Sequence, residues 1–158
     1  NGIFAFALWD GRKRKLYLFR DRVGVKPCFY ARKGGCIIFS SEIKGILSYP
    51  GMEARVDKEG LCEVLGLGPA KTYGKGVFQG VEEVLPGHFM ECGEDCVREH
   101  CYWKLESRPH EESWEETAEK MRWLVVDAVR MQMLSDVPVC TFLSGGVDSS
   151  LVTAICSR

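Results

Sequence analysis

The stretch VPVCTFLSGGVDSSLVTAI, residues 137–155, decides how the last part of this chain folds. Residues 137–143 are mostly apolar or β-branched, which is typical of a buried strand. Residues 147–155 follow a helical pattern, and the glycines of SGG lie between the two. The order of strand, glycine loop and helix predicts the opening of an α/β unit.

The glycine loop has the composition of an anion site. Two adjacent glycines allow the backbone to approach a ligand closely. The helix that follows presents N–H groups without intrahelical partners and a partial positive charge at its N-terminus. Asp148 fits beside a phosphate when a divalent cation such as Mg²⁺ bridges the two. The hydroxyl donors nearby are Ser144, Ser149 and Ser150.

Two common phosphate-binding motifs do not match this loop. A Walker A loop requires a lysine after its last glycine, and a dinucleotide fingerprint requires spaced glycines, whereas Gly145 and Gly146 are adjacent. The plain alternative is a tight connection between strand and helix, with Asp148 acting only as a helix cap. The residues themselves leave both interpretations open.

The first half of the chain is expected to be rich in strands. Strands are predicted within 1–10 and 16–22, and two more within 25–42 around the turn KGG. This spacing predicts antiparallel sheet, and the continuous apolar runs predict burial of both faces. Helices are predicted over 41–49 and 56–68, the second capped by Asp57 and ended by Gly66 and Gly68. A glycine-rich loop is expected over 68–80, and a hairpin from 81–92 and 96–105.

A polar segment, ESRPHEES (106–113), predicts a linker, and the clearest helix follows over 113–134. Ser113 and Glu116 form a capping-box signature. An apolar stripe at helical spacing predicts one buried face rather than a cofactor site. Its members are Trp114, Ala118, Met121, Val125 and Ala128. Two domains are therefore expected, 1–108 and 109–158, and neither is expected to be complete.

Composition excludes several classes of protein. The 158 residues carry a net charge of −1, so no overall basic field attracts nucleic acid or an anionic membrane. The basic turn GRKRK, residues 11–15, lacks interleaved aromatics and is expected to be a solvated tip. No apolar run is long enough to span a bilayer. The expected location is the cytoplasm, with the eight cysteines as free thiols.

Two clusters are open to a catalytic or metal interpretation. The stretch GHFMECGEDCVREHCYW, residues 87–103, contains three cysteines and two histidines, but it has no CxxC pair and alternates like a hairpin. The stretch RDRVGVKP, residues 20–27, resembles a charged catalytic cluster. Structural ion pairs at a strand edge are the preferred interpretation of its charges.

The sequence SGGVDSS resembles the PP-loop of the N-type ATP pyrophosphatases. That superfamily includes GMP synthetase, NAD synthetase, tRNA-thiolating enzymes and asparagine synthetase. Its members cleave ATP between the α and β phosphates and adenylate a substrate oxygen. The upstream blocks RDRVGVKP, SSEIK and SDVPV, in this order, are similar to glutamine-dependent asparagine synthetase, and the resemblance extends over essentially the whole chain.

This resemblance implies a fold of α+β followed by α/β. Residues 1–108 correspond to the C-terminal half of an Ntn-type glutaminase sandwich of antiparallel sheets. Residues 109–158 correspond to the first helix, strand, PP-loop and helix of a Rossmann-like parallel-sheet synthetase domain. The implied ATP and pyrophosphate site consists of Leu143, Ser144, Gly145, Gly146, Val147, Asp148, Ser149 and Ser150, and Asp148 is the candidate Mg²⁺ ligand.

The resemblance also implies the reaction and its participants. Asparagine is made from aspartate, ATP and glutamine-derived ammonia through β-aspartyl-AMP. The expected cofactors are ATP and Mg²⁺. The expected partners are aspartate, glutamine or ammonia and a second copy in a homodimer, with no nucleic acid and no membrane.

The family's nucleophile is an N-terminal cysteine, whereas this chain begins at Asn1, so no catalytic residue is assigned. The chain is expected to be an internal segment that is inactive alone. Cys28 and Cys36 are expected to pack rather than act as substitute nucleophiles. Two alternatives remain. One is a β-lactam synthetase-like or other PP-loop adenylating enzyme, and the other is a non-catalytic nucleotide-binding remnant.

Overall fold

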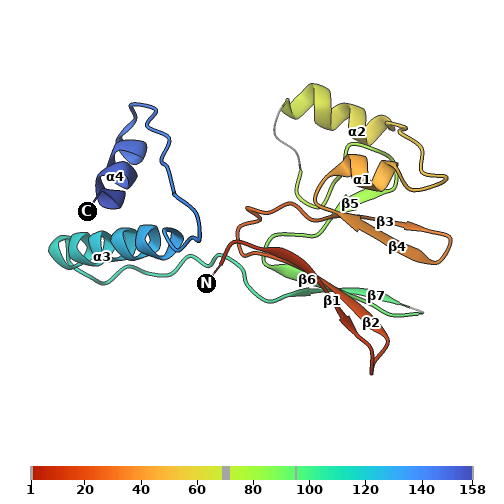
Figure 1. The fold of residues 1–158 in the computed structure, drawn as a ribbon, viewed down its shortest axis with the longest axis horizontal. Coiled ribbons are helices and arrows are strands. Elements are labelled where there is room, and N and C mark those ends of the chain that lie inside the picture. The colour runs from red at the N-terminus through yellow and green to blue at the C-terminus, as the bar shows by residue number, and fades with distance from the viewer. Residues whose placement is uncertain (1, 69–71, 95, 158) are drawn as a thin grey trace. The chain divides into compact units, whose positions relative to one another are not determined.

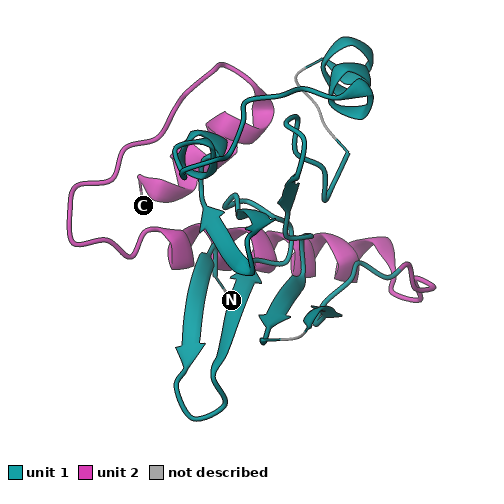
Figure 2. Cartoon of the chain, turned by 90° about the vertical axis from the view of Figure 1, so that its right-hand side faces the viewer, with its two compact units in different colours: residues 1–106 teal, residues 107–158 magenta. Residues whose placement is uncertain are grey.

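The computed structural model describes residues 2–68, 72–94 and 96–157, and it divides the chain into two compact units (Figure 1 and Figure 2). Unit 1 runs from Asn1 to Glu106 and unit 2 from Ser107 to Arg158. All described strands belong to unit 1, and the two longest described helices belong to unit 2. No helix in the described ranges is long and apolar enough to cross a membrane.

Unit 1 contains two antiparallel sheets, as the strand spacing predicted. Sheet A has the strand order β1 (Ala5–Asp10), β2 (Lys15–Arg20), β6 (His88–Cys92), β7 (Val97–Cys101). Sheet B has the order β4 (Cys36–Ser40), β3 (Phe29–Lys33), β5 (Val81–Glu83). Every described pairing is antiparallel. The predicted hairpin arm 81–92 is two strands in the structure: β6 forms the hairpin with β7, as predicted, whereas β5, separated from β6 by a turn at Pro86 and Gly87, pairs with β3 instead.

Local turn chemistry forms the two hairpins that the sequence predicted. Gly34 and Gly35 join β3 to β4 with φ of 56° and 78°, a backbone conformation that favours glycine. In the second hairpin Cys92 pairs with Val97, and the Gly93 N–H donates to the Cys96 carbonyl at 2.8 Å. The cysteine-rich stretch is therefore the β6–β7 hairpin. Asp95 of its predicted turn lies outside the described residues.

The core of unit 1 lies between the two sheets and beneath one helix. Leu18 and Met90 of sheet A pack with Tyr30 of sheet B and with Val84, and the first two side chains are almost fully buried. On the other face of sheet B, Ala31 packs against Ile46 of α1 (Ile43–Leu47). Figure 1 shows the resulting order of layers, which is sheet A, sheet B and α1.

The outer face of sheet A carries a row of stacked rings across all four strands. Phe6, Phe19, Phe89 and His100 are successive cross-strand neighbours, with ring centroids 4.8, 5.0 and 4.7 Å apart. Such pairs stabilise a sheet beyond the area that they bury. Phe6 is nevertheless about half exposed, at 47%. Both faces of sheet B are covered, as expected. The outer face of sheet A is not covered by the described part of the chain.

The predicted helix over 56–68 is two segments in the structure. Asp57 caps α2 (Lys58–Cys62), as predicted, by accepting the Gly60 N–H at 2.9 Å. A π-helical segment, η1 (Glu63–Leu67), then continues the chain. Gly68 ends the segment with φ of 63°. The prediction that Gly66 also ends the helix is wrong, because the wider π-helical turn carries the chain past it.

Unit 2 consists of α3 (Trp114–Gln132), an extended connection and α4 (Val147–Cys156). The predicted capping box is present, because Ser113 accepts the Glu116 N–H and Glu116 accepts the Ser113 N–H. Two predictions are contradicted. No residue of α3 is buried, although an apolar stripe was expected to be, and residues 137–143 form no strand. Burial and strand pairing both require a neighbouring surface, and none of the described segments of unit 2 supplies a strand beside 137–143.

Candidate anion-binding site at the N-terminus of helix α4

The loop before α4 has the backbone shape that its glycines allow. Gly145 has φ of 85°, a conformation that other residues adopt only with strain. Gly146 is the N-cap residue, extended at φ −78° and ψ 162°, and it has no side chain with which to cap the helix. The first N–H groups of α4 are therefore not occupied by a side-chain cap. The alternative that Asp148 caps this helix is wrong, because Asp148 lies inside its first turn.

Hydroxyl groups surround this helix end. The Ser144 and Ser149 side-chain oxygens are 3.0 Å apart, and the hydroxyls of Ser149 and Ser150 donate to the Gly146 carbonyl at 3.1 and 2.8 Å. Backbone N–H groups at a helix N-terminus, together with hydroxyl donors, suit an anion such as phosphate. Asp148 adds a carboxylate in the first turn. One carboxylate with phosphate oxygens is the usual ligand set of Mg²⁺, so the residues fit this ion in the presence of a phosphate.

A pocket of about 410 Å³ lies beside the loop. It is lined by residues along α4, by the extended connection and by the end of α3. Of the predicted site residues, Asp148 and Ser149 line it. The Thr153 hydroxyl donates to Thr141 at 3.0 Å, which holds the connection against α4. Leu143 and Val147 are exposed, and they are not among the lining residues. In the described ranges no group of three or more His, Cys, Asp or Glu side chains forms a metal cluster by itself.

The charges of the stretch RDRVGVKP have a structural role, as predicted, because they form a buried ion pair and hydrogen bonds. Arg20 and Asp21 are 4% and 1% exposed. Arg20 forms a 2.9 Å ion pair with Glu83 and donates to the carbonyls of Lys26, Val84 and Gly24. The Asp21 carboxylate accepts the N–H groups of Val23, Val25 and Lys26. Burial opposes ionisation of Asp21, but these backbone hydrogen bonds outweigh it and lower the pKa of Asp21.

Neither cysteine considered as a substitute nucleophile has a suitable setting. Cys28 is buried, and burial raises its pKa to about 11, so it is a neutral thiol at physiological pH. Cys36 is exposed on β4, and a hydrogen bond to Cys36 raises the pKa of Tyr49. All eight cysteines are free thiols, as expected.

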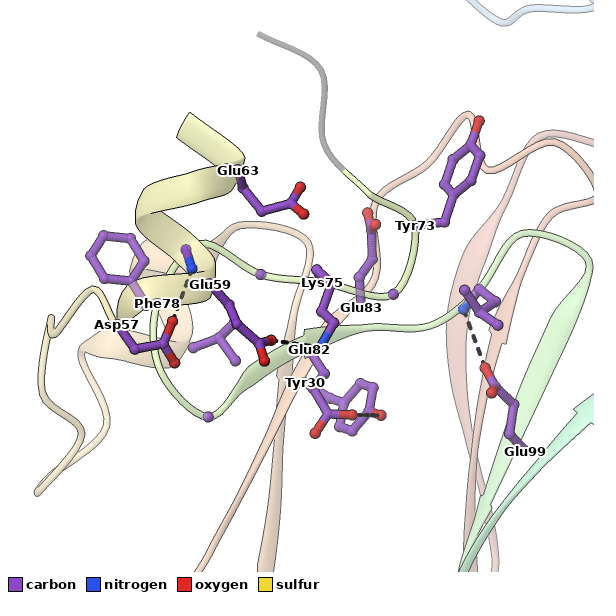
Figure 3. A pocket seen from close by; sticks show the side chains of 16 residues that line it. Tyr30, Asp57, Glu59, Glu63, Tyr73, Lys75, Phe78, Glu82, Glu83 and Glu99 are labelled. Atoms are coloured by element: carbon purple, nitrogen blue, oxygen red, sulfur yellow. Dashed lines mark hydrogen bonds and ion pairs between the residues drawn. The ribbon is translucent and has the colours of Figure 1, made fainter. Parts of the chain in front are cut away.

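Sequence reasoning missed a pocket of about 460 Å³ in unit 1 (Figure 3). Its wall is acidic, but its side chains pair with each other or with backbone. Lys75 binds Glu59 at 2.9 Å, the Tyr30 hydroxyl donates to Glu82, and Glu99 accepts the Leu85 N–H at 3.4 Å. The lining comes from scattered segments of the chain, so no local motif signals it.

Each of the two units contains a segment that matches a known protein family. Residues 1–103 match the family model described as glutamine amidotransferase domain, and residues 120–158 match the model described as asparagine synthase. Asparagine synthetase (glutamine-hydrolyzing) 3 of Bacillus subtilis (strain 168) is 51% identical over 98% of this chain and 25% of its own length. Amidase chry2 of Gibberella zeae is 35% identical over 100% of the chain and 24% of its own length. Asparagine synthetase (glutamine-hydrolyzing) 2 of Bacillus subtilis is 34% identical over 96% and 22%.

The chain therefore belongs to the glutamine amidotransferase domain family, because that model covers most of its length. It continues into a segment that matches asparagine synthase, in the order that the sequence resemblance implied. The chain spans about a quarter of the length of these relatives.

Proposed function

We propose that this chain is part of an ATP-dependent, glutamine-hydrolysing asparagine synthase. The observation that carries the proposal is the glycine loop at the N-terminus of α4, which follows a glutamine amidotransferase domain in the same chain. Glutamine hydrolysis supplies ammonia. The synthetase part joins the aspartate side-chain carboxylate to AMP with release of pyrophosphate, and ammonia then displaces AMP to give asparagine.

The site residues have separate roles in this proposal. Gly145 and Gly146 shape the loop so that backbone N–H groups reach the pyrophosphate portion of ATP. The hydroxyls of Ser144, Ser149 and Ser150 add donors, and Leu143 and Val147 flank the loop. Asp148 holds Mg²⁺, which neutralises phosphate charge. The resemblance and the helix-end geometry support these roles.

The proposal extends to the fold and the setting of the protein. Unit 1 is part of an Ntn-type sandwich, an assignment supported by its two stacked antiparallel sheets. Residues 137–143 become a strand of a Rossmann-like parallel sheet when a neighbouring strand is present. The eight free thiols support a reducing location such as the cytoplasm. A homodimer is the proposed assembly, to be tested by sedimentation velocity.

The test uses the protein expressed from its whole reading frame, with release of pyrophosphate as the readout. Pyrophosphate should form only when aspartate and Mg·ATP are both present, and asparagine should appear when glutamine or ammonia is added. Asp148→Asn should slow pyrophosphate release about 100-fold, as expected for loss of a metal-ligating charge at the transferring group. Ser157→Ala, at the other end of α4, is the matched control and should leave the rate unchanged. Formation of ADP instead of pyrophosphate contradicts the proposal.

A second candidate function is a relative that adenylates a different carboxylate, as in a β-lactam synthetase. One relative, 35% identical, is named as an amidase, so the relatives of this chain are not all named as asparagine synthetases. The same assay separates the two, because this candidate releases pyrophosphate with a carboxylate other than aspartate. The third alternative, a non-catalytic nucleotide-binding remnant, predicts ATP binding with no pyrophosphate release.

A further inference from the structure

Two side-chain hydrogen bonds join the chain before the glycine loop to helix α4. The Thr153 hydroxyl donates to the Thr141 hydroxyl at 3.0 Å, and this contact is partly buried. Nearer the loop, the hydroxyl oxygens of Ser144 and Ser149 are 3.0 Å apart. Thr141 is also partly buried, whereas every other residue of 137–146 is exposed. We call Thr141 and Thr153 the threonine pair.

The two contacts lie at different heights along the two arms of the loop. From Ser149 to Thr153 the helix advances by about 6 Å, which is roughly one turn. From Ser144 back to Thr141 the connection covers three residues, about 10 Å when extended. The serine contact is therefore next to the glycines, and the threonine pair ties the base of the loop, outside the loop itself.

Backbone hydrogen bonds do not hold this connection. Residues 137–143 form no strand, and none of their backbone groups bonds to α4. Within the described residues 107–157, the two hydroxyl contacts are the only hydrogen bonds from 137–144 to α4. The position of the incoming chain against the helix therefore depends on these side chains.

The serine contact cannot hold the loop when an anion is bound. Ser149 has one hydroxyl proton and donates it to the Gly146 carbonyl at 3.1 Å, so Ser144 supplies the proton between the two serines. A serine that donates to an oxyanion has to turn this proton away from its present acceptor. The threonine pair lies outside the loop and keeps its hydrogen bond.

The glycines make such a tie necessary. Gly145, at φ of 85°, and the extended Gly146 have one of the many shapes that adjacent glycines can adopt. When the base of the loop is tied, part of this freedom is lost before a ligand arrives. A site that is ordered in advance binds more tightly, because binding no longer has to order it.

We propose that the threonine pair is a positioning pair that holds the glycine loop in the shape that receives the pyrophosphate portion of ATP. This inference rests on the proposed function. Without the hydrogen bond, only a fraction of the molecules has the binding shape, and the apparent affinity for ATP falls by that fraction. The chemical step itself is unchanged once ATP is bound. The effect therefore belongs to the KM for Mg·ATP and not to kcat.

The experiment compares Thr141→Val and Thr153→Val, singly and together, in the protein expressed from its whole reading frame. Valine keeps the shape of threonine and lacks the hydroxyl, whereas Thr153→Ser keeps the hydroxyl. Thr72→Val is the matched control, because it removes a threonine hydrogen bond, to Glu63, in unit 1. The measured quantities are the KM for Mg·ATP and the kcat of pyrophosphate release with aspartate, the rate of glutamate formation from glutamine, and thermal unfolding.

Each valine variant should raise the KM for Mg·ATP about fivefold, as expected for the loss of one hydrogen bond, with kcat and glutamate formation within twofold of the parent. The double variant should match the single variants, because both remove the same bond. Thr153→Ser and Thr72→Val should keep the parent KM.

An unchanged KM in the valine variants overturns the inference. Effects that multiply in the double variant, or an equal rise in Thr153→Ser, also overturn it, since the shared hydrogen bond is then not the cause. A fall in kcat and glutamate formation together with the unfolding temperature shows a merely structural role and overturns it as well. If the parent protein itself releases no pyrophosphate from Mg·ATP with aspartate, the proposed function fails first, and the parent alone reveals this.

Discussion

Arg20 shows how one buried cation organises a whole region of unit 1. Its guanidinium contacts one carboxylate and three carbonyls from the loop after β2 and the end of β5. Arginine suits this role because its planar fork offers several fixed donors and stays charged when buried. The charged residues Arg20 and Asp21 of RDRVGVKP therefore hold the loop after β2 in place.

Cys28 provides a prediction about pH and stability. Burial raises the pKa of this thiol from its ordinary 9.0 to about 11, with a smaller opposing effect from Arg20. Between these values the unfolded chain loses the proton while the folded chain keeps it. The contribution of Cys28 to the free energy of unfolding is therefore fully present below pH 9. It is lost as the pH rises to 11, and the loss is on the order of 2 kcal/mol.

The measurement is urea unfolding at pH 8, 9, 10 and 11, monitored by circular dichroism. The Cys28→Ala variant should be less stable at pH 8 but should show a flatter decline toward pH 11. Cys36→Ala is the control, because this thiol is exposed. Tyr102, whose pKa is also raised by burial, titrates in every variant and drops out of the comparison. Equal slopes for Cys28→Ala and the parent contradict the prediction.

Helix α3 begins where local chemistry dictates. Ser113 and Glu116 satisfy each other's backbone N–H groups, and acidic residues in the first turn interact favourably with the helix dipole. The pKa of Glu116 is lowered, because its charged carboxylate accepts hydrogen bonds from Ser113. No long-range contact is needed for this start, so the sequence predicted it.

Loss of this cap should weaken the helix measurably. Ser113→Ala removes the side-chain acceptor and should lower the stability of unit 2 by about 1 kcal/mol. Ser113→Asp keeps an acceptor and should restore most of that loss, and Ser107→Ala, in the segment before the helix, should change nothing. Urea titration followed by helical circular dichroism checks all three. A loss for the aspartate variant as large as that for alanine rules out the capping explanation.

The described molecule leaves much apolar surface uncovered. Trp114 and Phe142 in unit 2 are 81% and 91% exposed, and no residue of α3 or α4 is buried. Contiguous exposed apolar surface promotes association. The chain of 158 residues should therefore self-associate when expressed alone.

Sedimentation velocity and the fluorescence of an apolar dye test this expectation at rising protein concentration. Phe142→Ser should reduce both association and dye binding. Leu105→Ser removes a side chain of similar exposure from the irregular segment between β7 and α3, and it should have a much smaller effect. A monomeric parent chain that binds no dye contradicts the prediction.

Features that depend on neighbours in sequence were predicted well. The glycine turn at 34–35, the Asp57 cap and the capping box at 113–116 are each formed by a few adjacent residues. For the candidate site, the sequence identified the glycine loop and the serines around it, and the structure contains the loop, its hydroxyl contacts and the helix that follows. Binding of ATP and Mg²⁺ by these residues stays a prediction.

The sequence by itself determined the turns, the caps, the antiparallel character of unit 1 and the family of the chain, because these follow from local backbone preferences and short motifs. Only the tertiary structure decided that β5 pairs with β3 instead of continuing the hairpin arm of β6, and that Arg20 pairs with Glu83. It also decided that, among the described residues, 137–143 has no strand partner and no residue of α3 is buried. Pairing and burial depend on which distant segment supplies the other surface, and periodicity shows only that a surface is suited to be covered.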